Sequence, residues 1–155
     1  MVIVLNALHD DLNLTQDNFF DNQKTSQVTS AFSIQLRGMN LDMLGTLIES
    51  HDVKVRVYHA TDTNLLTFRA LVTENLKQSN DFVLVNYLRR SIGQESGGHI
   101  SPIAAYDHST DRFLLLDVAS YKYLPVWVKT DELWQAMNTI DNDGGKTRGF
   151  VLVSP

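Results

Sequence analysis

The sequence of 155 residues contains no cysteine. Disulfides, thiolate metal sites and a cysteine nucleophile within the chain are therefore excluded, while the redox compartment stays undecided. No apolar run is long enough to cross a bilayer, and the apolar start lacks the basic region and cleavage site of a secretory signal. The formal net charge is −5, with no cluster of Lys and Arg, so we expect neither a nucleic-acid nor a membrane partner.

The composition is typical of a globular protein, with 43% hydrophobic and 20% charged residues. No repeat, linker or low-complexity segment divides the chain, so we expect residues 1–155 to form a single domain. Helices precede a run of antiparallel strands, which indicates the α+β class. Apolar periodicity predicts helices over 1–8, 39–50, 63–78 and 130–137, strands over 53–58, 81–88, 99–106, 112–118 and 148–153, and a polar surface connection over 9–33 with a short helical piece near 17–20.

Capping residues mark the start of two of these helices. Asn40 or Asp42 is expected to cap the second helix, and Thr130 the last. The first helix begins inside its apolar run at Met1 and has no capping residue, so we expect its natural beginning to lie before Met1.

A histidine and an aspartate stand at matching places in the predicted hairpin: His99 enters its first strand and Asp117 leaves the second. A turn centred on His108 would set them directly opposite, and one centred on Ser109 would make them diagonal neighbours on the same face. A turn centred between two residues, half a residue away from either position, would put the two side chains on opposite faces. Pro102 within the first strand predicts an edge position or a bulge.

On one face, the carboxylate would orient the imidazole and stabilise its charged form, as in a catalytic triad. A lone histidine and an aspartate at a strand end are also ordinary structural residues, so the spacing alone leaves both roles open.

Six motifs make the chain comparable with known proteins. They are GGHISPI at 97–103, LLLDVA at 114–119, YKY at 121–123, PVWV at 125–128, LWQAM at 133–137 and TRGF at 147–150. Together they resemble the phytochelatin synthases. With the segments at 39–50, 57–59 and 82–89, the resemblance covers nearly the whole chain and is weakest over residues 9–33.

The resemblance implies a papain-like cysteine-peptidase fold and the C-terminal portion of a phytochelatin synthase catalytic domain. It implies a glutathione γ-glutamylcysteinyl dipeptidyltransferase, in which a cysteine thiolate attacks the Cys–Gly bond of glutathione and releases glycine. The γ-Glu-Cys acyl group then passes to glutathione or a phytochelatin peptide, or to water. Cadmium or zinc would act as activators or arrive as metal–glutathione thiolates, with no metal held by this chain.

The resemblance also assigns roles by position. His99 matches the catalytic base and Asp117 the residue that orients it. For substrate binding, Asn86 matches a contact residue and Gly98 a backbone position lining the acyl site. Asp141 and Arg148 match the residues that hold the amino and carboxylate ends of the γ-glutamyl group, and the forked guanidinium suits a carboxylate. Without the resemblance, Asp141 reads as a turn residue and Arg148 as a solvated strand start.

The chain departs from the family's pattern in its nucleophile. In the family, Cys-Gly-x-Ala-Ser precedes the helix that VIVLNAL at 2–8 matches. The resemblance therefore implies that the nucleophile lies before Met1, that the fold lacks its N-terminal part and that this chain is inactive alone. Ser120 and Leu124 replace an arginine and a proline found in many members, which leaves the choice of acceptor open.

Several alternatives remain at this point. The chain is part of an active transferase, part of an enzyme that acts mainly as a glutathione hydrolase, or a pseudoenzyme that binds glutathione without turnover. A cytoplasmic location is expected, and a homodimer is one expected assembly. Two less specific alternatives are a histidine metal site from His51, His59, His99 and His108, and a hydroxyl nucleophile from Thr25, Ser26 or Ser30.

Overall fold

The computed structural model describes residues 1–9, 12–95, 97–118 and 122–155. The fold is α+β, as predicted, and is built on a six-stranded sheet in the order β1-β6-β2-β3-β4-β5, in which every neighbouring pair is antiparallel. The strands are β1 (Lys54–His59), β2 (Phe82–Leu88), β3 (Gly98–Asp107), β4 (Arg112–Leu115), β5 (Val126–Lys129) and β6 (Gly149–Ser154).

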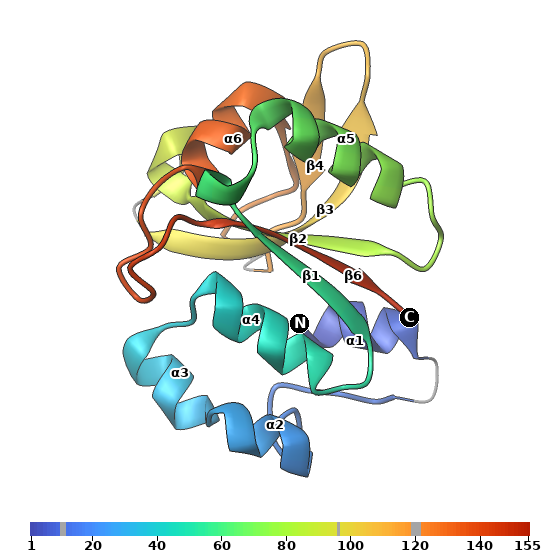
Figure 1. Ribbon diagram of the computed structural model, residues 1–155, viewed down its shortest axis with the longest axis vertical. Coiled ribbons are helices and arrows are strands. Elements are labelled where there is room, and N and C mark those ends of the chain that lie inside the picture. Colours follow the sequence, from blue (N-terminus) through green and yellow to red (C-terminus); the bar gives the residue numbers. More distant parts are fainter. Residues whose placement is uncertain (10–11, 96, 119–121) are drawn as a thin grey trace.

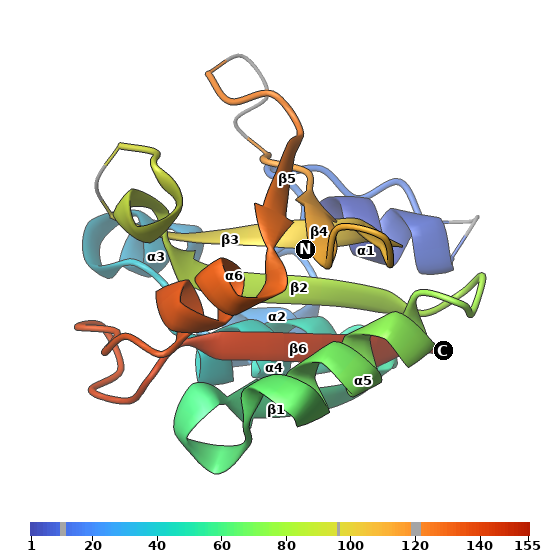
Figure 2. The ribbon, with the colours of Figure 1, turned by 90° about the horizontal axis from the view of Figure 1, so that it is seen from above.

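Helices cover both faces of this sheet (Figure 1). On one face lie α1 (Val2–Leu8), α2 (Gln23–Val28), α3 (Ala31–Arg37) and α4 (Leu41–Glu49). On the other lie α5 (Leu65–Asn75) and α6 (Thr130–Met137), and the short 3-10 helices η1 (Ala60–Asp62) and η2 (Arg89–Ile92) follow β1 and β2. Seen from above, β1, β6, β2 and β3 follow one another between these layers (Figure 2).

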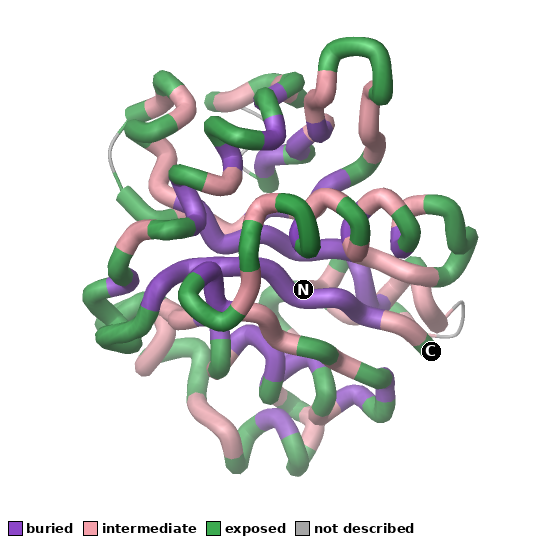
Figure 3. The backbone as a smooth tube through the Cα atoms, turned by 45° about the horizontal axis from the view of Figure 1, so that its top comes forward, coloured by how far each residue is buried: buried purple, intermediate pink, exposed green. Residues whose placement is uncertain are grey.

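The sheet separates two hydrophobic cores because successive side chains of a strand point to opposite faces. In β6, Phe150 and Leu152 belong to the core under α5 and α6, whereas Val151 and Val153 belong to the core under α1 and α4. The central strands are therefore buried on both sides (Figure 3). This explains why the β2 sequence is apolar without alternation.

The predictions for α1, α4, α5, α6 and five strands are confirmed within a few residues, but the prediction for residues 9–33 is wrong. The segment 16–20 forms turns instead of a helix, and α2 and α3 follow it. The side chains of Asn22 and Ser30 cap these two helices, accepting hydrogen bonds from the backbone N–H of Lys24 and Ser33. Short helices of this kind depend on tertiary packing, here the contact of α2 with α4 and the burial of Thr25, which periodicity does not reveal.

A β-bulge in β3 decides the geometry of the hairpin. At its tip Asp107 pairs with Arg112, so the turn is centred between residues 109 and 110. If this register continued along the hairpin, His99 and Asp117 would lie on opposite faces of the sheet. The register shifts between Ile103 and Ala105, and Ile103 then pairs with Leu115, as a turn centred on Ser109 would require. The extra residue restores the common face.

The bulge also explains Pro102, which pairs with Leu84 of β2 inside the sheet and not at an edge. A proline has no N–H to donate to a ladder, and Pro102 stands directly before the bulge, where the regular pairing of β3 with β4 is interrupted. The backbone N–H of Leu116 donates to the Pro102 carbonyl oxygen at 3.0 Å. β4 ends at Leu115, three residues earlier than the predicted 112–118, and Asp117 lies beyond the strand.

Asp111, which has a positive φ of 51°, fastens the hairpin turn to α5 and α6. Its carboxylate binds the Arg69 guanidinium through two hydrogen bonds of 2.9 and 2.7 Å, and Tyr106 Oη donates to it at 2.7 Å. The Thr130 hydroxyl also donates to the Asp111 carboxylate, at 2.8 Å. The prediction that Thr130 caps α6 is wrong, because Thr130 is the first residue of the helix and Lys129 is its N-cap. The Arg69 guanidinium, with Tyr106 and Thr130, holds the pKa of Asp111 well below its usual range.

We expect Asp111→Asn to lower the free energy of unfolding at pH 7 by about 1–2 kcal/mol, the scale of charge-assisted hydrogen bonds reduced by solvent screening. The reduction applies because the side chain is 44% exposed. Since the folded-state pKa is depressed, this stabilisation is present above the ordinary carboxyl pKa of about 3.9 and is lost as the pH falls through the lower folded value. Urea unfolding at several pH values measures it.

The exposed Asp17 gives a matched control. Asp17→Asn should leave the unfolding midpoint nearly unchanged. A difference between wild type and Asp111→Asn that stayed constant down to pH 2 would contradict the assignment of the effect to the ionised carboxylate.

Candidate active site

The fold brings together the histidine and the aspartate predicted from the hairpin. His99 is the second residue of β3, opposite Tyr87 of β2, and Asp117 follows β4. The imidazole Nε2 lies 3.0 Å from Asp117 Oδ1. Only 1% of the Asp117 side chain is exposed, against 18% for His99. The carboxylate is therefore buried behind the imidazole.

Arg89, which sequence reasoning missed, completes this arrangement. Its Nη2 lies 2.5 Å from Asp117 Oδ2, so the two carboxylate oxygens serve the guanidinium and the imidazole separately. Arg89 begins η2 directly after β2, and its Cζ lies 4.6 Å from the centre of the Tyr123 ring. The signal in the sequence is a basic residue at the end of a buried strand, which gives no partner without the strand order.

Burial lowers the pKa of His99, because the charged imidazolium loses solvation. The charge of Asp117 acts in the opposite direction, and that of Arg89 lowers the pKa further. A neutral imidazole that donates its Nε2 proton to Asp117 leaves Nδ1 with a free lone pair. Nδ1 has no hydrogen-bond partner within the part of the chain that the structure describes, so His99 is arranged to accept a proton there.

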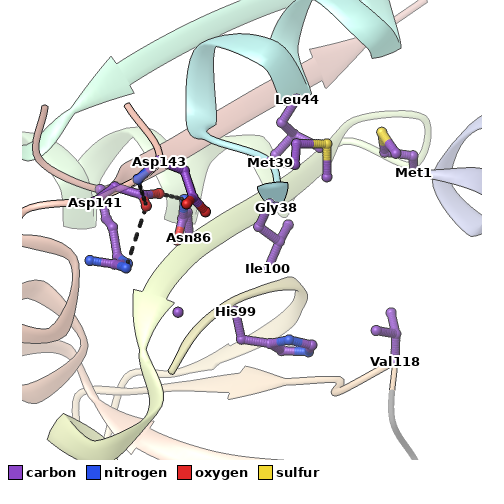
Figure 4. Close-up of a pocket in the computed structure, with 12 residues that line it drawn as sticks. Met1, Gly38, Met39, Leu44, Asn86, His99, Ile100, Val118, Asp141 and Asp143 are labelled. Atoms are coloured by element: carbon purple, nitrogen blue, oxygen red, sulfur yellow. Dashed lines mark hydrogen bonds and ion pairs between the residues drawn. The ribbon is translucent and has the colours of Figure 1, made fainter. Parts of the chain in front are cut away.

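A cavity of about 370 Å³ lies in front of His99. His99 and Val118 lie on one side of it and Met1 of α1 above them, while a polar group of side chains lies at the far side (Figure 4). Between them the lining is apolar, with Met39, Leu44 and Ile100. A ligand in this cavity would have its polar end held at a distance from the imidazole.

The polar side of the cavity is formed by three residues predicted as substrate-binding. Asn86 Nδ2 donates to Asp141 Oδ2 at 2.8 Å, and Asp141 Oδ1 lies 3.5 Å from Arg148 Nη2. Asn86, Asp141 and Arg148 are 2%, 6% and 6% exposed. Asp141 also begins a turn, because its carbonyl accepts from the backbone N–H of Gly144 and Gly145, but its side chain is buried in the cavity wall.

Gly98 packs directly against the Arg148 guanidinium. A Cβ at position 98 would lie 2.6 Å from Arg148 Nη2, closer than such contacts occur, so a side chain here would displace the arginine. All six predicted site residues therefore contribute to one cavity wall or its support. The chemical roles given to them from the resemblance stay predictions.

A further set of contacts fixes the loop between α6 and β6 that carries Asp141. His59 Nδ1 donates to the carbonyl oxygen of Thr147 at 2.6 Å, while Nε2 lies 2.9 Å from Asp42 Oδ1. Lys146 Nζ lies 2.7 Å from the other oxygen of Asp42. Asn40, rather than Asp42, caps α4, accepting from the Met43 N–H. Asp42 is thereby free to join α4 to this loop.

The alternative chemistries are not assembled in the described residues. His51 contacts Thr25, His59 contacts Asp42 and His108 lies against Tyr106. Within the four described ranges no group of three metal-ligating side chains occurs, and none of the helices there could cross a membrane. The candidate hydroxyls are also elsewhere: Thr25 is buried beside His51, Ser26 is exposed on α2 and Ser30 caps α3. Leu124 is 79% exposed, and Ser120 lies outside the described residues.

The family model named phytochelatin synthase matches residues 1–150. The chain belongs to the phytochelatin synthase family. Its motifs at 97–103 and 147–150 thus supply the imidazole and the guanidinium that face the cavity in this member of the family.

Curated relatives match most of the chain. Glutathione gamma-glutamylcysteinyltransferase 3 of Lotus japonicus is 31% identical over 157 residues, covering 99% of this chain and 33% of the relative. Glutathione gamma-glutamylcysteinyltransferase 1 of the same plant is 37% identical over 121 residues, covering 78% of this chain and 24% of the relative. Glutathione gamma-glutamylcysteinyltransferase of Schizosaccharomyces pombe is 27% identical over 137 residues, covering 88% of this chain and 33% of the relative. The chain spans about a quarter to a third of the length of these relatives.

We expect Asp117→Asn to lower the pKa of His99 further, because the carboxylate charge is what opposes desolvation and the Arg89 charge. Titration of the histidine ring protons by NMR measures this pKa. Asp131→Asn, which removes an exposed carboxylate in the first turn of α6, serves as the control and should leave the pKa of His99 as in wild type. An unchanged or raised pKa of His99 would show that Asp117 does not act on the imidazole in solution.

Proposed function

We propose that this chain provides the general base and the γ-glutamyl pocket of a glutathione γ-glutamylcysteinyltransferase with a papain-like active site. The observation that carries the proposal is the shared cavity, with His99 at one side and the Asn86–Asp141–Arg148 group at the other. The matched relatives carry the name of this transferase. The Asp117 carboxylate holds Nε2 of His99 and leaves Nδ1 to a nucleophile, which fits the role of the orienting residue in a catalytic triad.

In the proposed reaction, the Arg148 guanidinium receives the α-carboxylate of glutathione, and the Cys–Gly peptide bond reaches His99. The His99 Nδ1 takes the proton of a thiol, and the thiolate sulfur attacks the Cys carbonyl carbon. The imidazolium then gives this proton to the nitrogen of the departing glycine, which leaves a γ-Glu-Cys thioester. His99 next removes a proton from the α-amine of glutathione or a phytochelatin, or from water, as that group attacks the thioester carbonyl carbon. The C–S bond then breaks, and the departing sulfur takes the proton back from the imidazolium.

The thiol has to come from outside these 155 residues, because the chain has no cysteine. Cadmium or zinc would enter as substrate, bound by glutathione thiolates, since soft sulfur ligands suit these metals. Transfer to water in place of a thiol peptide would make the protein a glutathione hydrolase. A cytoplasmic location, a homodimer and phytochelatin peptides as acceptors stay predictions.

The same cavity supports a second candidate, a glutathione-binding protein without turnover. The observation in its favour is that the chain contains no thiol, although Asn86, Asp141 and Arg148 are all in place at the polar side of the cavity. The two candidates share the ligand and differ in chemistry.

We expect the isolated chain to bind glutathione in calorimetry and Arg148→Lys to weaken binding about tenfold, since a charged hydrogen bond contributes about 1.5–3 kcal/mol. Lysine keeps the charge beside Asp141, so the protein should stay folded, but it lacks the planar fork that pairs with a carboxylate. The exposed Arg56 on β1 is the control, and Arg56→Lys should bind like wild type. Equal affinity in Arg148→Lys would remove the γ-glutamyl pocket from the proposal.

We expect the chain as it stands to release no glycine from glutathione. A chimera that supplies the family's Cys-Gly-x-Ala-Ser segment ahead of Met1 should release glycine, and His99→Ala in that chimera should abolish the release. Quantifying free glycine by chromatography follows both, with His108→Ala as the matched control. Turnover by the unmodified chain, or an active His99→Ala chimera, would refute the proposed base, and an inactive chimera that binds glutathione would favour the binding protein.

A further inference from the structure

A second cavity lies on the sheet face that α5 covers, away from the candidate active site (Figure 2). It measures about 270 Å³ and is lined by residues of β1, β6 and the last turn of α5, namely Lys54, Arg56, Asn75, Leu152, Val153 and Ser154. None of them lines the cavity in front of His99. The antiparallel pairing of β1 and β6 explains the separation, because this end holds Lys54 and Ser154, while the candidate active site adjoins the end where His59 pairs with Gly149.

Lys54 and Arg56 bring two positive charges to this second cavity. They stand two positions apart on β1, an edge strand, so both side chains leave the sheet on the same face, with Cα atoms about 7 Å apart. Both residues are exposed, and neither has an ion pair with any residue that the structure describes, whereas Lys77 beyond α5 pairs with Glu74 at 2.8 Å. The two charges are therefore available to an anion.

Asn75 distinguishes a ligand site from an ordinary charged edge. Charged side chains commonly protect an edge strand from pairing with another chain, so Lys54 and Arg56 alone do not indicate a site. Asn75 ends α5 and is only 6% exposed, yet its Oδ1 is fully enclosed without a hydrogen-bond partner among the described residues. A buried amide left in this state has a free-energy cost that a polar ligand in the cavity would remove.

The Asn75 amide and the two cations suit the same kind of ligand. The amide oxygen and nitrogen exchange places by a half-turn of the side chain, so Asn75 can donate an N–H to an oxyanion or accept from a hydroxyl on it. Lys54 supplies an ammonium and Arg56 a forked guanidinium, both common partners of phosphate. The cavity therefore offers three separate side-chain donors to one ligand.

The end of α5 opposes an anion, but less strongly than the two cations favour it. A helix C-terminus carries the equivalent of about half a negative charge. Here the carbonyl oxygens of Val72 and Asn75 accept from the backbone N–H of Leu76 and Gln78, at 3.0 Å each. Two unpaired positive charges consequently leave the cavity with a net positive charge.

We propose that the cavity between β1, β6 and α5 binds the phosphoryl group of a small molecule, with Lys54 and Arg56 on its charged oxygens and Asn75 as the third partner. A phosphoryl group fits better than a carboxylate because it carries close to two negative charges and has three terminal oxygens for the three side chains. The site shares no residue with the cavity in front of His99, so it is independent of the proposed transferase function.

The test is a calorimetric titration of the protein with inorganic phosphate at about pH 8 and constant ionic strength. We expect Lys54→Gln to weaken phosphate binding at least about threefold, the scale of a charged hydrogen bond at a partly solvated site, and removal of both Lys54 and Arg56 charges to abolish it. Asn75→Asp, which keeps the shape but adds a negative charge, should abolish it as well. Lys129→Gln is the matched control, because Lys129 is an exposed lysine on the opposite edge strand, and it should bind phosphate as wild type does.

Each contrary outcome overturns the phosphoryl site. These outcomes are no phosphate binding by wild type, equal affinity in Lys54→Gln and wild type, or an equal loss in Lys129→Gln. Acetate bound as tightly as phosphate would show general attraction of anions and would overturn it too. If Asn75→Asp fails to fold, the variants of the exposed Lys54 and Arg56 still decide the question. Glutathione affinity should stay as in wild type in the Lys54 variant, so this site and the γ-glutamyl pocket stand or fall separately.

Discussion

The buried carboxylate of Asp117 is the constraint on which the site depends. An anion that is 1% exposed needs charged or hydrogen-bonding partners, because an unpaired buried charge costs several kcal/mol. Its partners include His99 at the start of β3 and Arg89 directly after β2. Satisfying one carboxylate therefore brings two strand ends and the segment after β4 to one place, and the imidazole is oriented as a consequence.

The same strand order assembles the opposite side of the cavity. Because β6 inserts between β1 and β2, Asn86 pairs with Gly149 and stands beside Arg148, although the two segments are far apart in the chain. The loop before β6 is held from α4 by Asp42, which meets both His59 and Lys146. The pocket wall is thus supported by the side chains of Asp42, His59 and Lys146, which do not line the cavity themselves, as a preorganised binding site requires.

The chain therefore contains the proposed base and the proposed binding pocket but no cysteine to act as nucleophile. Burial lowers the pKa of His99 and so favours the neutral imidazole, which can accept a proton; the charge of Asp117 opposes this shift and the charge of Arg89 adds to it. Such an imidazole is useful only if a group that loses a proton approaches Nδ1. This is the physical reason why the proposed activity depends on a thiol supplied from elsewhere, while ligand binding does not.

Much of the fold and the site was open to prediction from the sequence. The apolar stripes of α1, α4, α5 and α6 and the patterns of five strands determined these elements, because each must bury one or both faces. Strand β5, with the half-exposed Trp127, and the short helices α2 and α3 lacked such a pattern. The motif resemblance selected the six site residues, and the cavity includes or is supported by all of them.

Tertiary structure alone decided the rest. The strand register at the hairpin tip would have placed His99 and Asp117 on opposite faces of the sheet. The bulge beside Pro102 shifts this register by one residue and brings both side chains to one face. Arg89 carries no local signal, since its significance lies in the Asp117 carboxylate that it meets only in the folded chain. A sequence determines which segments bury apolar surface, but the register between strands and the partners of a buried charge depend on residues distant in the chain. Those contacts exist only once the sheet has formed.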